Sequence, residues 1–504
     1  MRVLGLSFGF HDAGACMLQD EHIEFAGHSE RYSKDKNDPW INRELISAAI
    51  EKGLPDVIVL HEKAWAKRLR NIYAGNWAAL KEPTQKQWIK RFYPELAGIP
   101  IKSFWHHETH AAAGVLSSNF DECAVMVIDA IGEFNTASIW QWKEGKLKKL
   151  HSVNFPNSLG LFYSAVTHRV GLKPMEDEYI LMGMAAYGDR NKWKPIADTM
   201  GKTYFKHHYP WISHKNPIKM TKNLQKGISK DSFNGESEFD IAAAAQYQVE
   251  ERVLSYAKYA KQLTGSNNLV YMGGVALNCV ANSLLFSIYN DIFIMPNPGD
   301  CGSSLGAASL YLYNKTGKKA NWKTPYLGYE IKGKYPINKA LKSLKAGELF
   351  GIANGRAEFG PRALGNRSLC ADPRGPHVKD KMNVIKKRQK FRPFAPMILE
   401  EYVHDYFEMP GNISHAPYMQ FVARCKFPEE FPAIIHEDGT SRVQTVRKEE
   451  HPDLHKLLTK FYNETGCPML LNTSLNIKGQ PIVNDEADAE AFAKHYGVKV
   501  HVRD

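Results

Sequence analysis

Three histidines within five residues form the clearest candidate metal site in this sequence. They lie in HHETH at 106–110, after a predicted strand and before the small-residue run AAAG. His106 and His110 are four positions apart, so on a helix both imidazoles share one face and can bind one metal ion. Glu108 does not match the general base of a zinc-protease HExxH motif, because that motif places Glu directly after its first His.

A metal ion at this position would need carboxylate ligands or open coordination positions. Asp129 ends the predicted strand AVMVID, and Asp300 lies in the turn NPGD. Two histidines with one or two aspartates suit iron, manganese or zinc. An isolated histidine is more often structural than a ligand, so the clustering is what favours a metal.

The C-terminal part of the chain carries a basic cluster with few compensating acids. It reads GRAEFGPRALGNR at 355–367 and KKRQKFR at 386–392. Guanidinium groups bind phosphate and carboxylate oxygens two at a time. We interpret the cluster as an anion pocket, with a surface patch or an RNA-binding face as the alternatives. Its candidate binding residues are Arg356, Arg362, Arg367, Lys386, Arg388 and Arg392.

Two short polar motifs add further candidates. The segment NTSLN at 472–476 follows an apolar strand, and its hydroxyl and amide groups could bind a polar substrate or cap a helix. His11 and Asp12 lie in the first turn of the chain. A neutral histidine beside a carboxylate could accept a proton from an alcohol near pH 7, although a structural turn histidine is the simpler interpretation.

The elements around these motifs indicate an α/β protein with an internal duplication. Residues 1–26 and 124–150 each read as a strand, a polar turn and further strands. With polar residues in the first turn of each copy, this layout resembles the actin/Hsp70/sugar-kinase superfamily, in which the two turns hold nucleotide phosphates and a metal. A helix is predicted over 240–264, with Asp240 as its N-cap and Gly265 as its end.

Glycine and small residues mark a possible ligand approach and a domain boundary. A predicted strand runs into a glycine turn within 268–285, and the stretch CGSSLGAA follows the NPGD turn. Such residues permit close approach of backbone to a ligand. The polar, lysine-rich segment 317–347 contains the expected boundary, which divides the chain into domains 1–328 and 329–504.

Composition excludes several classes of protein. The chain has 504 residues, of which 43% are hydrophobic and 24% charged, as in globular proteins. Seven scattered cysteines without a C-x-x-C pair argue against a zinc knot or a disulfide framework. No apolar run is long enough for a membrane helix or a secretion signal, so we expect a cytoplasmic protein. The net charge of +11 favours an anionic partner, and the lysine-rich run 215–230 is interpreted as a surface loop.

Taken together, the motifs resemble the NodU/CmcH family of O-carbamoyltransferases along nearly the whole chain. No single block identifies the family, but the occurrence of so many matching blocks in the same order does. The matching blocks are HDAGACM (11–17), SERYSK (29–34), HHETHAA (106–112), SLGLFYSAVT (158–167), DEYILMGMAAYG (177–188), GGVALNCVAN (273–282), NPGDCGSSLGAA (297–308), GRAEFGPRALGNRSLCADPR (355–374), KKRQKFRPFAP (386–396), DGTSRVQTV (438–446) and LNTSLNIKGQPIV (471–483).

The resemblance implies a fold and a two-step reaction. An actin-like N-terminal domain, similar to the tRNA threonylcarbamoyladenosine transferase, would be joined to a YrdC-like C-terminal domain. The latter would convert carbamoyl phosphate and ATP, accompanied by Mg²⁺, into carbamoyl adenylate and pyrophosphate. The actin-like domain would then use a metal, iron in this family, to transfer the carbamoyl group to an acceptor hydroxyl with release of AMP.

The resemblance also assigns roles to residues. The K-x-R and S-x-N motifs that hold the intermediate in YrdC-like domains map to Lys386, Arg388, Ser474 and Asn476, with Asn472 beside them. His11 becomes the general base, with Asp12 orienting it or the acceptor. The metal ligands become His106, His110, Asp129 and Asp300. The residues implied to line the nucleotide are Gly273, Gly274, Asn278, Gly302, Ser303 and Ser304.

Four positions depart from the family pattern and bear on the acceptor and the carbamoyl group. They are Ile180, Gln389, Leu475 and Gln480, which stand where relatives have Lys, Glu, Phe and Glu. A threonylcarbamoyl-type transferase acting on tRNA, or a non-catalytic nucleotide- or nucleic-acid-binding protein, is the alternative function. The expected partners are ATP, carbamoyl phosphate and a hydroxyl acceptor, with an anionic acceptor favoured by the charge. Neither a membrane nor nucleic acid is required, and a homodimer remains open.

Overall fold

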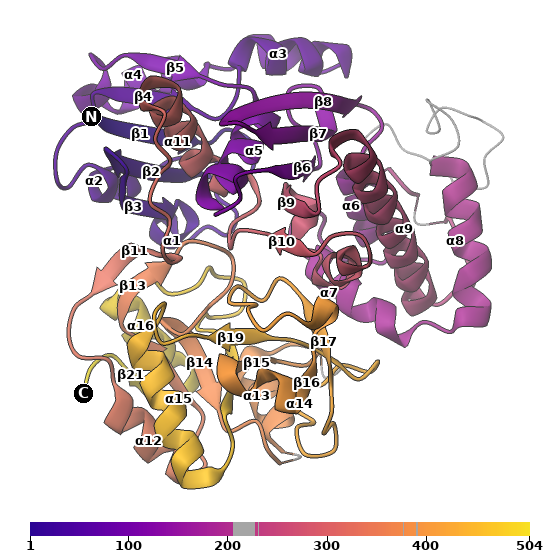
Figure 1. The fold of residues 1–504 in the computed structure, drawn as a ribbon, viewed down its shortest axis with the longest axis vertical. Coiled ribbons are helices and arrows are strands. Elements are labelled where there is room, and N and C mark those ends of the chain that lie inside the picture. The colour runs from indigo at the N-terminus through magenta and orange to yellow at the C-terminus, as the bar shows by residue number, and fades with distance from the viewer. Residues whose placement is uncertain (205–226, 230, 376, 390–391) are drawn as a thin grey trace.

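The computed structural model describes residues 1–204, 227–229, 231–375, 377–389 and 392–504 (Figure 1). Most of the lysine-rich run 215–230 lies outside these residues, so its interpretation as a surface loop stays a prediction. Within the described part of the chain, none of the helices combines the length and the apolar character that a membrane span requires.

The first half of the chain forms two five-stranded sheets of identical topology. In each sheet the first strand pairs antiparallel with the second and parallel with the fourth. This confirms the predicted duplication. The sheet orders are β3-β2-β1-β4-β5 and β10-β9-β6-β7-β8. The strands are β1 (Arg2–Ser7), β2 (Gly14–Gln19), β3 (His22–His28), β4 (Val57–Leu60), β5 (Ile101–Ser103), β6 (Cys123–Ile128), β7 (Asn135–Lys143), β8 (Lys146–Asn154), β9 (Asn268–Met272) and β10 (Asp291–Phe293).

Two helices, α5 (His106–Ser117) and α11 (Ser303–Thr316), pack between these sheets (Figure 1). Their small residues explain the close approach, because a Cβ on Gly306 would lie 2.0 Å from the Thr109 carbonyl oxygen. Both helices are buried over most of their length, which suits their alanine- and glycine-rich sequences. The packing fixes the start of α5, where the histidine motif lies.

The outer helices are α2 (Arg43–Ala49), α3 (Ala64–Tyr73) and α4 (Gln85–Phe92) in the first half of the duplication, and α6 (Leu159–Arg169), α7 (Glu178–Met184), α8 (Arg190–Tyr204) and α9 (Glu238–Thr264) in the second. Helix α2 packs on β2 and β3, α6 and α9 pack on the second sheet, and α7 and α8 pack on α9. The predicted long helix is confirmed as α9 and ends at Gly265, whose φ is 69°. Its N-cap is Ser237 rather than Asp240, which instead accepts a hydrogen bond from the Asp189 amide.

The C-terminal part contains a six-stranded sheet in the order β19-β15-β20-β14-β12-β21. Its strands are β12 (Phe350–Ala353), β14 (Arg367–Ala371), β15 (Ala395–Leu399), β19 (Gln444–Val446), β20 (Met469–Ser474) and β21 (Val500–His501). Smaller sheets are formed by β11 (Tyr326–Ile331) with β13 (Gly355–Glu358), and by β16 (Phe407–Glu408), β17 (Val422–Cys425) and β18 (Thr440–Arg442). Its main helices are α12 (Ile337–Lys345), α13 (Val378–Lys386), α15 (Pro452–Thr465) and α16 (Glu486–Tyr496).

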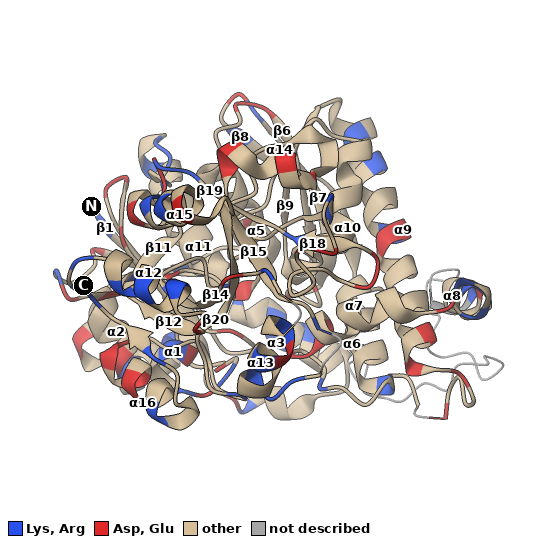
Figure 2. Cartoon of the chain, turned by 90° about the horizontal axis from the view of Figure 1, so that it is seen from below, with Lys and Arg blue, Asp and Glu red and all other residues tan. Residues whose placement is uncertain are grey.

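The expected boundary between residues 328 and 329 falls inside strand β11. Strand β11 pairs antiparallel with β13 and also packs on β3, so it contacts both parts of the chain. Figure 2 shows basic residues on α3, α12 and α13, and acidic residues on α9 and α16. The basic residues are therefore spread over several elements and are not confined to one of them.

Candidate functional site

The predicted metal ligands come together in a buried centre. His106 and His110 occupy the first turns of α5, Asp129 directly follows β6, and Asp300 begins the short helix η8 (Asp300–Gly302). His106 Nε2 lies 3.1 Å from His110 Nε2 and 3.1 Å from Asp129 Oδ2. His110 Nε2 lies 3.2 Å from Asp300 Oδ1. One ligand atom of each side chain is within 4.8 Å of all the others, which fits a single cation.

The electrostatics of this centre also favour a cation. Burial alone would lower the pKa of His106 and His110, yet the carboxylates of Asp129 and Asp300 raise both. Two imidazole nitrogens facing each other at hydrogen-bond distance need a shared proton or a metal between them. The two carboxylates supply negative charge, and the four donors together are a common set for iron, manganese or zinc.

Neighbouring groups hold the ligands in place. Glu133, in the loop after β6, accepts hydrogen bonds from the backbone amides of His106 and Lys63. The Gly274 amide donates to Asp129 Oδ1 at 3.1 Å. The third histidine of the motif, His107, turns away and pairs with Ser138 Oγ. Sequence reasoning missed Glu133, whose place in the turn of the second repeat was its only signal.

His11 and Asp12 lie in the β1–β2 turn beside this centre. His11 Nδ1 is 3.2 Å from Asp12 Oδ2, and His11 Nε2 donates to the Met175 carbonyl at 2.7 Å. Although burial opposes a charge on the imidazole, Asp12 and the Met175 carbonyl raise the pKa of His11 to about 10. His11 is thus an imidazolium near neutral pH in this conformation, whereas the expected general base must be neutral.

The K-x-R and S-x-N motifs lie in direct contact with each other. Lys386, at the end of α13, donates through Nζ to the Ser474 carbonyl at 2.8 Å and to Asn476 Oδ1. Ser474 Oγ donates to the same amide oxygen at 2.7 Å. Asn472, on the same strand β20, donates to the Ala363 carbonyl at 2.9 Å and leaves its buried Oδ1 without a hydrogen-bond partner.

A group of arginines surrounds these motifs. Arg388 stacks on the Phe394 ring, and Arg392 lies over the Tyr179 ring. Among the described residues, none of Arg362, Arg388 and Arg392 forms an ion pair with a carboxylate. Burial first, and then the neighbouring positive charges, lower the pKa of each of these arginines. Such crowding of like charges is relieved when an anion binds, which supports the predicted anion pocket.

Arg442, on strand β18, belongs to the same group although the sequence analysis did not select it. It is among the charges that lower the pKa of Arg362 and Arg388. It lies in the block DGTSRVQTV at 438–446, where a basic residue within a short polar strand was the available signal. Tyr179, beneath Arg392, was likewise missed.

Two of the predicted anion-binding residues are structural instead. Arg367 is fully buried, and its guanidinium donates to backbone carbonyls of Asn484, Asn354, Gly355, Asn366 and Tyr329. Arg356 donates to the carbonyls of Gly328, Leu327 and Glu24. Neither guanidinium lines the cavity that Arg362 and Arg388 line, so both residues join β11 and β13 to the rest of the chain rather than bind a substrate there.

We expect Arg367→Ala to reduce the free energy of unfolding by about 4 kcal/mol, because several buried carbonyls lose their donors and a cavity remains. Urea denaturation measures this loss. Lys345→Ala is the control, since Lys345 forms an exposed pair with Glu464 and its removal should change stability by less than about 0.5 kcal/mol. Near-wild-type stability of Arg367→Ala would contradict the structural role.

The residues expected to line a nucleotide divide into two groups. Gly274 and Asn278 line a cavity, and Asn278 also caps helix α10 (Cys279–Leu284). Gly273 instead lies under the Ile128 carbonyl oxygen, 2.2 Å from where its Cβ would be. Gly302 packs on the Asn297 carbonyl oxygen, and Ser303 and Ser304 are fully buried. Gly302, Ser303 and Ser304 therefore pack behind Asp300, and none of the four residues of this second group lines the cavity.

One cavity of about 950 Å³ connects the two regions. At one end it is lined by the His11–Asp12 turn, Asp129 and Asp300, and at the other by the basic residues and the S-x-N motif. Three of the departures, Ile180, Gln389 and Gln480, line it, whereas Leu475 is fully buried in the core. Its other selected lining residues are Arg362, Lys386, Arg388, Arg392, Arg442, Asn472, Ser474 and Asn476.

Two solved structures resemble the chain distantly. The (R)-2-hydroxyglutaryl-CoA dehydratase component A of Acidaminococcus fermentans is 14% identical, with a TM-score of 0.36, over 63% of this chain and 100% of that chain. HypF of T. kodakarensis is 14% identical, with a TM-score of 0.35, over 62% of this chain and 48% of that chain. These likenesses are too weak to support an argument.

Comparison with sequences is decisive. The family profile described as Carbamoyltransferase N-terminus matches residues 90–309, and that described as Carbamoyltransferase C-terminus matches residues 341–503. Nodulation protein NolO of Bradyrhizobium diazoefficiens is 34% identical over 76% of this chain and 75% of that protein. The 3'-hydroxymethylcephem-O-carbamoyltransferase of Amycolatopsis lactamdurans is 28% identical over 97% of this chain and 95% of that protein. The chain belongs to the NodU/CmcH family of carbamoyltransferase enzymes.

Proposed function

We propose that this protein is an ATP-dependent O-carbamoyltransferase whose two parts perform successive steps. The YrdC-like part, residues 329–504, makes carbamoyl adenylate. The actin-like part, residues 1–328, transfers the carbamoyl group to a hydroxyl. The observation that carries the proposal is the cavity of about 950 Å³, which is lined at one end by the basic residues and at the other by Asp129 and Asp300, the two carboxylates of the histidine–aspartate centre.

The first step uses the basic end of the cavity. Carbamoyl phosphate loses its phosphoryl group to water, which yields carbamate and inorganic phosphate. A carbamate oxygen then attacks the α-phosphorus of ATP, and the bond to pyrophosphate breaks. Arg362, Arg388 and Arg392 neutralise phosphate charge that would repel the attacking oxygen. Mg²⁺ accompanies ATP in this step.

Lys386 has a second role in that step. Its ammonium group is already fixed by the Ser474 carbonyl and the Asn476 side chain. Burial and the neighbouring arginines lower the pKa of Lys386 well below its ordinary value. A phosphate anion bound beside Lys386 would favour its protonated form, because opposite charges attract. The side chain is already positioned, so it then binds the carbamoyl and phosphate oxygens without further ordering. Ser474 and Asn476 add a hydroxyl and an amide for the carbamoyl group.

The second step uses the other end of the cavity. His106, His110, Asp129 and Asp300 would hold the metal, which the family resemblance makes iron. The metal would supply a Lewis acid that polarises the carbamoyl carbonyl. Gly274 and Asn278 contact the nucleotide that carries the carbamoyl group. The acceptor oxygen bonds to the carbonyl carbon, the bond to AMP breaks, and a carbamate ester forms.

His11 must lose its proton to accept one from the acceptor. A metal cation in the adjacent centre would lower the pKa of His11, because like charges repel. Displacement of the Met175 carbonyl by the acceptor hydroxyl would then leave Nε2 free as a base. Asp12 stabilises the imidazolium that results and keeps the ring oriented.

The acceptor is proposed to be a small hydroxylated anion, such as a sugar phosphate or nucleotide. The positive charge of the chain and of the cavity would repel a polycationic acceptor. Screening of hydroxyl compounds for carbamate formation by mass spectrometry tests this preference. Selection of neutral or cationic acceptors would overturn it.

The central test is ATP–pyrophosphate exchange. Exchange of labelled pyrophosphate into ATP should depend on carbamoyl phosphate, because adenylate formation is reversible and needs the carbamate. If exchange occurs equally without carbamoyl phosphate, or does not occur, the adenylate step is wrong. Tight, steeply salt-dependent binding of tRNA would instead favour the threonylcarbamoyl-type alternative.

A further inference from the structure

A buried carboxylate outside the proposed reaction centre organises the turn that carries His11 and Asp12. Glu62 follows strand β4, and its side chain is 5% exposed. Its Oε1 accepts from Lys67 Nζ at 2.6 Å and from Gln85 Nε2 at 3.1 Å. Lys67 belongs to α3 and Gln85 begins α4, so one carboxylate oxygen joins three elements.

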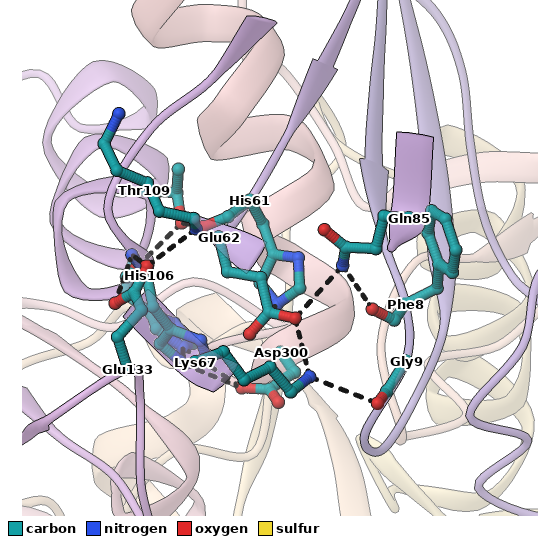
Figure 3. Close-up of polar contacts among 12 residues, drawn as sticks. Phe8, Gly9, His61, Glu62, Lys67, Gln85, His106, Thr109, Glu133 and Asp300 are labelled. Carbon is teal, nitrogen blue, oxygen red and sulfur yellow. Dashed lines mark hydrogen bonds and ion pairs between the residues drawn. The ribbon is translucent and has the colours of Figure 1, made fainter. Parts of the chain in front are cut away.

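Both partners of Glu62 extend to the same turn. Lys67 Nζ donates to the Gly9 carbonyl at 3.1 Å, and Gln85 Nε2 donates to the Phe8 carbonyl at 2.6 Å. Figure 3 shows the two side chains running from the Glu62 carboxylate to these consecutive carbonyls. Glu62 therefore holds two donors on the backbone immediately before His11.

This turn needs external support. Gly9 has φ of 99°, and Asp12 has φ of 47°, in the left-handed region that an aspartate occupies at a cost. Such a conformation persists only where surrounding contacts determine it. The hydrogen bonds to the Phe8 and Gly9 carbonyls hold the turn in this conformation. The amides of Gly9 and Ala13 add hydrogen bonds to the Pro39 and Asp38 carbonyls.

The same segment also contacts the other repeat. Lys63, next to Glu62, donates its amide to Glu133, and Glu133 accepts from the amide of His106. The residues after β4 thus connect the His11 turn to the start of the helix that carries two of the candidate metal ligands. A change at Glu62 is expected to move the turn relative to that helix.

The ligand geometry of His61, Glu62 and His106 would also allow a second metal ion. Lys67 argues against it, since its ammonium lies 2.6 Å from Glu62 and already provides the positive charge. His61 remains uncharged, because burial lowers its pKa to about 4. Three side chains with a resident cation do not need a metal to balance their charge.

We propose that Glu62, acting through Lys67 and Gln85, is a positioning residue that fixes the His11–Asp12 turn for carbamoyl transfer. The claim rests on the proposed function for its chemistry, but the conformation of the turn can be measured without it. Glu62 is not among the residues that line the cavity, so it acts through the turn and not on the substrate. Its effect is confined to the transfer step, because the basic residues that form the adenylate lie at the far end of the cavity.

The test compares Glu62→Gln with Lys67→Met and the double variant in the full-length protein. Glu62→Gln keeps the shape of the side chain and removes its charge. We expect AMP release, measured with ribose 5-phosphate as acceptor and with water alone, to fall about 100-fold in kcat with little change in KM. Carbamoyl-phosphate-dependent exchange should stay within about twofold. The double variant should be no worse than either single variant, since all three break one network.

A readout independent of activity keeps the two proposals separable. The imidazole signals of His11 in NMR spectra should shift and broaden in Glu62→Gln and Lys67→Met, and Lys67→Arg should restore them. Unchanged His11 signals, or equal losses of exchange and AMP release in a folded variant, would overturn the positioning role. If the wild type lacks exchange altogether, the proposed function fails, and the His11 signals still decide the role of Glu62.

The remaining outcomes are also decisive. If the melting temperature of Glu62→Gln is far below that of the wild type, Lys67→Met tests the positioning role in its place, because the Lys67 side chain is partly exposed. Binding of two equivalents of Zn²⁺ by the wild type, with one lost in Glu62→Gln, would show that the cluster is a metal site and would refute the proposal.

Discussion

Arg388→Ala is expected to abolish formation of carbamoyl adenylate. Arg388 is held by Asn383 and by the carbonyls of Arg392 and Pro393, so its guanidinium is rigid before substrate binds. Removal of a prepositioned charge of this kind costs about 10³-fold in rate. Carbamoyl-phosphate-dependent ATP–pyrophosphate exchange measures the loss, and AMP release should fall in parallel because it needs the adenylate.

Lys381, on the same helix α13, provides a matched control. It is exposed and is not among the residues that line the cavity. Lys381→Ala should leave exchange within about twofold of the wild type. Arg388→Lys keeps a positive charge but loses the planar fork, so it should recover part of the rate. Full exchange in Arg388→Ala, or an equal loss in Lys381→Ala, would refute the assignment of the K-x-R motif.

The fold was predictable where a local pattern determines an element. The repeated strand–turn–strand pattern predicted the duplication, and the two sheets do share one topology. The histidine spacing predicted the shared helical face of His106 and His110. Asp129 and Asp300 could be proposed because each follows an apolar strand, and the carboxyl ends of strands commonly carry ligands.

Other features could not be read from the sequence because they depend on tertiary contacts. Arg356 and Arg367 have the same local composition as Arg362 and Arg388, yet their guanidinium groups lie outside the cavity that Arg362 and Arg388 line. Only the three-dimensional path of strands β11 and β13 distinguishes the two sets. Glu62 gives no sequence signal at all, since its partners Lys67 and Gln85 come from two separate helices.

The pKa of His11 is a further example. A histidine followed by an aspartate predicts an oriented base, but the Met175 carbonyl comes from a loop more than a hundred residues away. Together with Asp12 it raises the pKa to about 10 despite burial. The sequence could name the residue, while its protonation state follows from the folded environment.

His110→Ala is expected to separate the two proposed steps. The side chain is fully buried, and its Nε2 faces His106 and Asp300. Its loss removes one of four ligands, so Fe²⁺ bound under anaerobic conditions should fall from about one equivalent to a small fraction, as measured by elemental analysis. Exchange should stay within about twofold, since the arginines are untouched.

Carbamoyl transfer by His110→Ala should fall about 10³-fold, because a Lewis acid supplies several kcal/mol of charge stabilisation. His107→Asn is the control, since His107 lies on the same helix, pairs with Ser138 and points away from the centre. It should retain both the metal and transfer. Equal loss of exchange and transfer in a folded His110→Ala protein would mean that both steps use one centre, because a metal needed only for transfer cannot affect the adenylate.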